Sequence, residues 1–143
     1  MEIASIIKKE FDYVKDSREE IIKKLTGKNS FVFAAKKNSV LAGFIFLRLR
    51  KGIAGIDGLA VKKNFRKKGL GSKLLKHALE FLKEKNFSAA RLFVLASNKS
   101  AIKFYKKNGF VENKEKGRKI KGRKVMLLEF FLPRENEIIK GVS

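Results

Sequence analysis

The chain contains no cysteine and a single histidine, and these two shortages exclude several classes of enzyme. Without cysteine it can form no disulfide, no thiolate metal site and no thiol nucleophile. The one histidine, His77, falls in a stretch with helical spacing and has no second histidine with which to build a metal site. We therefore expect no metal, interpret His77 as a surface or helix-packing residue and give it no catalytic role.

Long apolar runs are also missing. No run approaches the ~20 residues that a membrane-spanning helix needs. The N-terminus, Met1-Glu2-Ile3, does not have the pattern of a signal peptide. We therefore expect a cytoplasmic protein without a membrane segment.

The chain has one proline and no tryptophan, but thirteen phenylalanines and a hydrophobic fraction of 44%. That fraction is sufficient for one hydrophobic core. With 143 residues, we predict a single domain over residues 1–132. Pro133 ends the last strand pattern, so residues 133–143 are expected to form a flexible C-terminal tail.

Acidic residues are scarce: 14 Asp and Glu face 35 Lys and Arg, which gives a formal net charge of +21. The excess is concentrated after residue 60, where 23 of the 35 basic residues lie. Such a field favours nucleic acid, acidic proteins or a polyphosphate cofactor as partners. A lysine-rich proteome, in which lysine is the default surface residue, is the alternative, and composition leaves both open.

Hydrophobic spacing predicts a mixed α/β sheet with elements in the order ααβββαβαββ. Helices are expected near 2–14, 17–25, 72–85 and 98–108, and strands near 30–36, 40–49, 53–61, 88–95, from 110 onward and 125–132. Residues 114–124 are interpreted as a charged connection. Because a helix joins strands 53–61 and 88–95, these two strands should run parallel.

Residues 61–72, with the sequence VKKNFRKKGLGS, form a basic turn between an apolar strand and an amphipathic helix. The first turn of a helix offers unpaired N–H groups and the positive end of the helix dipole. Gly69 and Gly71 have no Cβ and would let a ligand approach the backbone. The turn therefore predicts a phosphate or pyrophosphate site, with a tight connection without ligand as the alternative.

Two motifs on these elements resemble those of the Gcn5-related N-acetyltransferase (GNAT) superfamily. The first is Arg/Gln-x-x-Gly-x-Gly/Ala before a helix and stands here as residues 66–71. The second, Asn-x-x-Ala-x-x-x-Tyr-x-x-x-Gly-Phe, stands as Asn98, Ala101, Tyr105, Gly109 and Phe110. The resemblance extends over nearly the whole chain to residue 132, although the family's usual first strand is missing or very short. It implies a GNAT-like acyl-CoA N-acyltransferase fold and transfer of acetyl from acetyl-CoA to a primary amine.

The resemblance also implies where acetyl-CoA binds. The backbone of the basic turn would hold the pyrophosphate, and the pantetheine arm would pair with the strand before it. A backbone N–H near Leu59 would polarise the thioester carbonyl. The implied cofactor-binding residues are Leu59, Ala60, Val61, Arg66, Lys67, Lys68, Gly69, Leu70, Gly71, Ser72, Asn98, Ala101 and Tyr105.

Two residues are candidates for the chemistry. Tyr105 stands where the family has its general acid, while the alternative is a core aromatic beside Phe104. Asp57 is the one carboxylate on strand 53–61. It lies two and four residues before Leu59 and Val61, so in a regular strand the three side chains would point to the same face of the sheet. It is a candidate general base, direct or through water, with an exposed sheet residue as the alternative.

The acceptor amine is not specified. Family members that acetylate protein N-termini or ribosomal proteins often read Leu-Glu-Val-Arg where this chain has Phe93 in place of the glutamate. The first two helices and the basic connection 114–124 would flank the acceptor cleft, repel polyamines and suit an acidic or nucleic-acid-associated acceptor. A homodimer is possible. The alternative function is a module that binds CoA or nucleic acid on an acetyltransferase scaffold without turnover.

Overall fold

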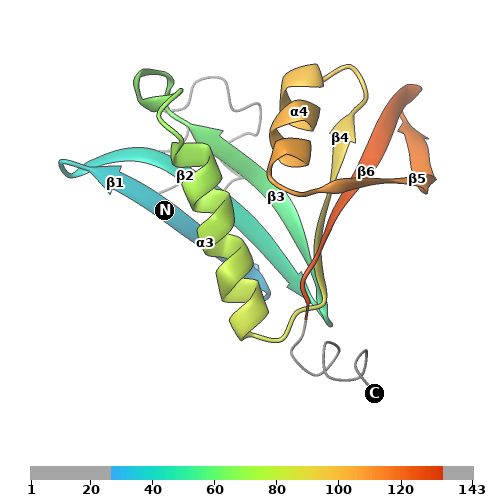
Figure 1. The fold of residues 1–143 in the computed structure, drawn as a ribbon, viewed down its shortest axis with the longest axis horizontal. Helices are drawn as coiled ribbons and strands as arrows, with labels where there is room; N and C mark the ends of the chain where they lie inside the picture. Colours follow the sequence, from blue (N-terminus) through green and yellow to red (C-terminus); the bar gives the residue numbers. More distant parts are fainter. Residues whose placement is uncertain (1–26, 134–143) are drawn as a thin grey trace.

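A computed structural model describes residues 27–133 of the chain (Figure 1). Its elements are β1 (Ser30–Lys37), β2 (Val40–Arg50), β3 (Ile53–Val61), the 3₁₀ turn η1 (Lys63–Phe65), α3 (Leu70–Glu84), β4 (Ala89–Leu95), α4 (Lys99–Lys107), β5 (Val111–Ile120) and β6 (Arg123–Phe131). From the first strand on, the order of helices and strands is the predicted one. The two helices expected before residue 26 and the tail expected after Pro133 lie outside the described residues.

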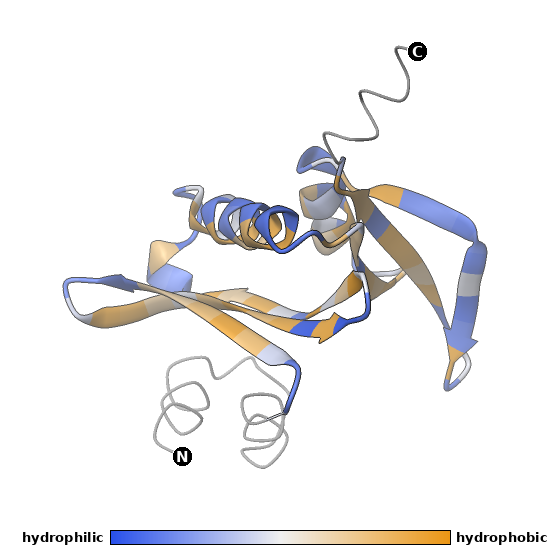
Figure 2. Cartoon of the chain, turned by 90° about the horizontal axis from the view of Figure 1, so that it is seen from below, coloured by the Kyte–Doolittle hydropathy of each residue, from blue (hydrophilic) through white to orange (hydrophobic). Residues whose placement is uncertain are grey.

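The strands form one sheet in the order β1-β2-β3-β4-β6-β5. Every neighbouring pair is antiparallel except β3 and β4, which run parallel as expected for strands joined by α3. Figure 2 shows α3 and α4 on the same face of the sheet, with the apolar side of α3 turned toward the strands. The strand order and the helix positions together match the predicted mixed α/β fold.

The pairing between β3 and β4 is short. It consists of three positions, Ile53–Ala89, Ala54–Ala90 and Gly55–Arg91, after which the two strands diverge (Figure 1). The sheet therefore has two leaves, β1–β3 and β4–β6, which are paired with each other at one end only. We refer to the region between the unpaired parts of β3 and β4 as the β3–β4 gap.

The core extends over both leaves and α4, and a large part of it is the apolar side of α3 packed against the β1–β3 leaf. The buried residues of α3 are the ones that its spacing predicted: Leu74, Leu75, Ala78, Leu79 and Leu82. They pack with Ile45 and Leu47 of β2, which are 0% and 1% exposed. Burial of each such side chain stabilises the fold by about 1.5–3 kcal/mol. His77 is exposed on α3 and makes an edge-to-face contact with Phe33, 4.9 Å between ring centres, as expected for a surface or helix-packing histidine.

A β-bulge interrupts β3 at Asp57. Leu47 of β2 pairs with Ile56, and the adjacent Phe46 pairs with Gly58, so Asp57 is an extra residue without a partner position in β2. An extra residue shifts the alternation of side chains between the two faces of a strand.

The bulge overturns one sequence-based expectation. After it, Leu59 packs against the core, and Val61 lies beside Gly71 on the helix-covered face. Asp57 instead binds Arg48, whose position in β2 lies between those of the core residues Leu47 and Leu49. Asp57 therefore does not share a face with Leu59 and Val61, contrary to the alternation expected from the sequence.

A second difference concerns the charged connection expected at 114–124. These residues belong to a long hairpin, in which β5 runs to Ile120 and β6 begins at Arg123. The β5–β6 register shifts between Asn113 and Arg118. Hydrophobic spacing predicted the start of β5 but missed its continuation, because β5 is an edge strand with a largely exposed, charged surface, a pattern that prevents pairing with other chains.

Candidate active site

The basic turn leads into the first turn of α3 with the geometry that an anion site requires. Gly69 precedes the helix with φ 76°, and no atom lies within 4 Å of the place where a Cβ would stand. The first intrahelical hydrogen bond runs from the Lys73 N–H to the Gly69 carbonyl, 3.0 Å. The N–H groups of Leu70, Gly71 and Ser72 therefore precede the helical ladder and are free to bind an anion. The helix begins two residues earlier than predicted.

The turn is fixed to the end of β3. Arg66 donates from Nε to the Val61 carbonyl at 3.0 Å, which ties the turn to the strand before it. Lys67 and Lys68 are exposed on the same turn, and Lys67 has a left-handed φ of 63°. At Gly71, a Cβ would stand 3.5 Å from the Phe104 ring of α4, an ordinary van der Waals distance, so the first turn of α3 packs against α4.

The edge of β3 beyond Gly55 faces the β3–β4 gap. Leu59, Ala60 and Val61 pair on one side with β2 and lie beyond the three positions at which β3 pairs with β4. A strand edge that lies beyond the pairing of its neighbour can bind an extended ligand through backbone hydrogen bonds. The three residues that the resemblance assigned to the pantetheine arm therefore lie along the gap, next to the basic turn.

Asn98 caps α4. Its Oδ1 accepts hydrogen bonds from the Ala101 N–H at 3.2 Å and from the Ser100 hydroxyl at 3.3 Å. These bonds fix the start of the helix, because the first N–H groups of a helix have no partner within it. The cap orients α4 and hence the position of Tyr105 one to two turns later.

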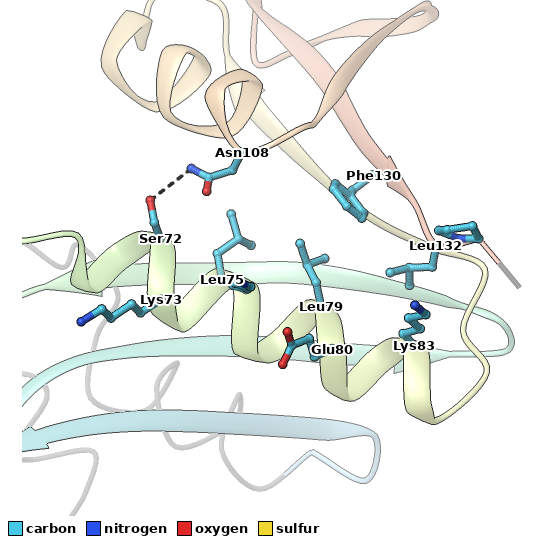
Figure 3. Close-up of a pocket in the computed structure, with 11 residues that line it drawn as sticks. Ser72, Lys73, Leu75, Leu79, Glu80, Lys83, Asn108, Phe130 and Leu132 are labelled. Atoms are coloured by element: carbon cyan, nitrogen blue, oxygen red, sulfur yellow. Dashed lines mark hydrogen bonds between the residues drawn. The ribbon is translucent and has the colours of Figure 1, made fainter.

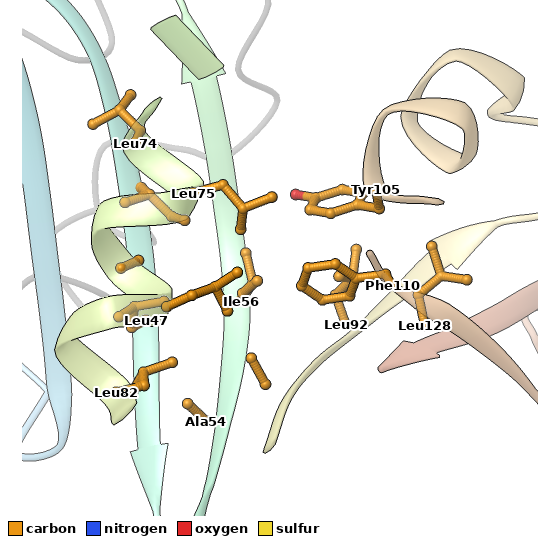
Figure 4. Close-up of a cluster of buried hydrophobic side chains, with 14 of the residues drawn as sticks. Leu47, Ala54, Ile56, Leu74, Leu75, Leu82, Leu92, Tyr105, Phe110 and Leu128 are labelled. Atoms are coloured by element: carbon orange, nitrogen blue, oxygen red, sulfur yellow. The ribbon is translucent and has the colours of Figure 1, made fainter. Parts of the chain in front are cut away.

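Tyr105 has a buried ring on the opposite side of the gap from α3. The residue is 7% exposed and its ring contacts those of Phe104 and Phe110, each 5.2 Å away between centres. Figure 4 shows the hydroxyl extending from α4 toward β3 and α3. Burial raises the pKa of Tyr105 to about 12, so the phenol holds its proton at neutral pH.

The Tyr105 hydroxyl makes no hydrogen bond to residues 27–133, yet no buried side-chain oxygen or nitrogen in this range lacks a partner. The hydroxyl oxygen therefore keeps some solvent exposure, although the residue as a whole is 7% exposed.

A cavity of about 410 Å³ lies against the gap on the sheet face opposite the helices. Its lining residues are Arg48, Arg50, Ile53, Gly55, Ile56, Asp57, Arg91, Leu92, Phe93 and Arg118. Asp57 accepts from Arg48 there, with Oδ2 2.9 Å from Nε and 2.7 Å from the terminal nitrogen. The sequence pointed to Asp57, to Phe93 and to the segment 114–124 that contains Arg118, but not to Arg48, Arg50 and Arg91. The strand register could have revealed two of them, because Arg48, Gly55 and Arg91 occupy paired positions on three adjacent strands.

A second cavity of about 510 Å³ lies on the helix-covered face, along α3 and beside the end of β6 (Figure 3). It is largely apolar, with Leu75, Leu79 and Phe130 among its lining residues. Ser72 is the one predicted cofactor-binding residue among those that line it, and it accepts a hydrogen bond from Asn108 at 3.3 Å. This cavity is therefore separate from the open edge of β3.

The predicted residues thus fall into two groups. Three elements border the gap on the helix-covered side: the basic turn, the edge of β3, and α4 with Tyr105. Asp57 meets the gap from the other side. Within residues 27–133 no group of His, Asp and Glu side chains could hold a metal ion, and no helix is long and apolar enough to cross a membrane.

The sequence and the fold match known proteins. The model of the acetyltransferase (GNAT) family matches residues 2–110. Streptothricin acetyltransferase A of Bacillus subtilis is 38% identical over 86 residues, which cover 59% of this chain and 49% of the relative. Spermidine N(1)-acetyltransferase of Thermoplasma acidophilum is 32% identical over 91 residues, which cover 64% and 56%. The chain thus spans about half the length of these relatives.

A solved structure agrees with the sequence match. PaiA N-acetyltransferase from Thermoplasma acidophilum, in complex with coenzyme A, superposes with a TM-score of 0.66 at 26% identity, over 91% of this chain and 77% of that one. The match to this family also accounts for three features of the structure: the divergence of β3 from β4, the glycine before α3 and the motif residues on α4. With more than half of its length matched by the family model, the chain belongs to the acetyltransferase (GNAT) family.

Proposed function

We propose that this protein is an N-acetyltransferase that transfers the acetyl group of acetyl-CoA to a primary amine by direct attack. The observation that carries the proposal is the β3–β4 gap, which has an anion-binding helix start at one end and the protonated Tyr105 in its wall. The names of the two relatives above, which act on streptothricin and spermidine, support an amine acceptor. We expect the reaction to take place in the cytoplasm, and a homodimer remains a prediction.

The residues present fit acetyl-CoA. The N–H groups of Leu70, Gly71 and Ser72 would bind the pyrophosphate, and the open space before Gly69 leaves room for it. Lys67 and Lys68 add positive charge beside this site. The backbone of 59–61 would pair with the pantetheine arm, and Asn98 and Ala101 would border it at the start of α4.

When bound, acetyl-CoA supplies an activated acetyl thioester with a thiolate leaving group. In the proposed reaction Tyr105 Oη donates its proton to the departing sulfur. A phenol that burial keeps protonated suits this role, because the same dry surroundings make the thiolate more basic. The backbone N–H near Leu59 would stabilise negative charge on the carbonyl oxygen.

Asp57 is proposed to accept the proton of the incoming amine. It meets the gap from the face opposite Tyr105, so the acid and the base would act from opposite sides. Its Oδ2 is held by Arg48, which fixes the carboxylate in place. The proton would pass to the carboxylate directly or through water.

Calorimetric titration with acetyl-CoA, followed by a screen of amines for CoA release, tests the proposal. Binding with turnover of at least one amine is expected. Binding without turnover of any amine would instead favour the CoA-binding module. Absence of acetyl-CoA binding would refute the assignment of the basic turn.

A further inference from the structure

The cavity on the face opposite the helices has an unusual charge. Four arginines line it, from three strands that are distant in the sequence: Arg48 and Arg50 on β2, Arg91 on β4 and Arg118 on β5. Asp57 is the one carboxylate among the described residues that line it. Like charges held around one cavity repel each other, so the site favours an anion.

Register explains how two of these arginines share a site. Arg48 pairs with Gly55, and Gly55 pairs with Arg91, so the two arginines stand on either side of a residue without a side chain. Two strand spacings separate them by roughly 10 Å. Gly55 therefore leaves open space between the two arginine positions, bordered on the Arg48 side by Asp57, whose Oδ1 lies 3.7 Å from where a Cβ of Gly55 would stand.

The arginines are only partly neutralised by the protein. Arg48 is paired with Asp57. Glu129, opposite Arg91 on β6, accepts instead from Asn113 at 2.9 Å. Within residues 27–133 no hydrogen bond or ion pair engages the side chain of Arg50 or Arg91.

The cavity also has an apolar wall. Phe93 is 42% exposed on β4, and the Arg118 guanidinium lies over its ring at 4.2 Å from the centre. Stacking holds the Arg118 guanidinium plane in a defined orientation. The cavity volume of about 410 Å³ is in the range of small-molecule sites.

We propose that this cavity binds the acceptor, and that the acceptor is a primary amine that carries a carboxylate or a phosphate. The inference rests on the proposed acetyl transfer, whose substrate class it narrows. The anionic group would bind Arg91 and Arg50, whose planar forks match carboxylate and phosphate oxygens. The ammonium group would turn toward Asp57 and the gap, where the base is proposed. Polyamines such as spermidine should be poor acceptors, because the cavity would repel them.

The test compares paired acceptors that differ in one anionic group. O-phosphoethanolamine is compared with ethanolamine, and β-alanine with its amide, with spermidine as a third arm. We expect kcat/KM to be about ten-fold or more higher for the anionic member of at least one pair, the size of a charge-assisted hydrogen bond. The pair that shows the preference distinguishes a phosphate from a carboxylate. A preference for spermidine or for both neutral members would overturn the inference.

Substitutions then locate the effect. Arg91→Gln should bring the anionic-to-neutral ratio close to one while KM for acetyl-CoA is unchanged, which also shows that the variant is folded. Arg91→Lys keeps the charge without the fork and should retain part of the preference. Arg123→Gln, which removes a positive charge on β6 outside the cavity lining, is the matched control and should leave the ratio unaltered. If both variants lose the preference for anionic acceptors equally, the preference arises from the general positive charge of the protein, and the cavity is refuted as its source.

Calorimetric titration of the acceptor tests this inference separately from the proposed function. If the protein acetylates none of these amines, the transferase assignment is in question, but O-phosphoethanolamine can still be titrated into the protein. Binding that Arg91→Gln abolishes and Arg123→Gln leaves intact would support the anion site. Absence of binding to the parent protein, together with absence of turnover, would refute it.

Discussion

Asn108 Nδ2 lies 3.3 Å from Ser72 Oγ, and this hydrogen bond joins the end of α4 to the first turn of α3. The same nitrogen lies 2.9 Å from the Phe104 carbonyl, so the side chain also closes the last turn of its own helix. Helix α3 packs against the β1–β3 leaf, whereas α4 connects two strands of the β4–β6 leaf. Asn108 therefore couples the proposed pyrophosphate site on α3 to the helix that carries Tyr105.

Replacing Asn108 with alanine should weaken this coupling. We expect a loss of about 1–2 kcal/mol in the free energy of unfolding, since two partly buried hydrogen bonds disappear. KM for acetyl-CoA should rise several-fold because Ser72 loses its partner. Asn113→Ala is the control: it removes a hydrogen bond to Glu129 of 2.9 Å, away from the gap. If both variants raise KM equally, the effect is one of stability alone.

Gly69→Ala should impair cofactor binding more than folding. A Cβ at φ 76° costs about 1 kcal/mol of strain, and the added methyl would enter the open space where the pyrophosphate is proposed to lie. Gly122→Ala provides a matched comparison, since Gly122 has φ 78° and the same absence of neighbours but lies in the β5–β6 turn. Urea unfolding should give similar losses for the two variants. Calorimetry should show weaker acetyl-CoA binding for Gly69→Ala only.

Tyr105→Phe should lower kcat about 100-fold, the usual contribution of a positioned proton donor. The ring contacts with Phe104 and Phe110 are kept, and the lost hydroxyl makes no hydrogen bond within residues 27–133. Stability and the dissociation constant of acetyl-CoA should therefore be almost unchanged. Parallel measurement of turnover and of calorimetric binding checks this, and turnover equal to that of the parent would remove Tyr105 from the mechanism.

The same residue predicts a dependence of stability on alkaline pH. Burial raises the pKa of Tyr105 from 10.0 to about 12 in the folded protein. Below pH 10 the phenol is protonated in both states, so its contribution to stability is fully present. Between pH 10 and 12 the unfolded chain loses this proton while the folded chain keeps it, so the contribution falls by up to about 1.4 kcal/mol per pH unit.

Urea unfolding of the parent and of Tyr105→Phe across this range measures the effect. The stability of the parent should fall relative to the variant above pH 10 and run parallel to it below. The chain has two tyrosines and no tryptophan, so tyrosinate absorbance can follow the same ionisation directly. Parallel stability curves through pH 11 would show that Tyr105 titrates normally.

The elements around the gap could be predicted because each has a strong local pattern. The apolar side of α3 and the glycine before it are local features, and the structure has them where the sequence placed them. The length of strand β5 was missed because exposed charge hides an edge strand from hydrophobic spacing. The face of Asp57 was predicted wrongly because one inserted residue in β3 changes the alternation. The arginine cavity needed strand register, which no single segment of the chain contains.

Gly109→Ala should be the most destabilising of the glycine changes considered. Gly109 follows α4 with φ 95°, and an added Cβ would lie 2.9 Å from Phe130 Cε2, closer than side-chain atoms normally approach. Strain and steric overlap should together cost more than the about 1 kcal/mol of strain expected at Gly122, where nothing lies within 4 Å. A double-mutant cycle with Phe130→Leu separates the two terms, because the smaller side chain removes the overlap but not the strain. We expect the added cost of Gly109→Ala to fall, in that background, to the Gly122→Ala value; an unchanged cost would mean that backbone strain alone explains the glycine.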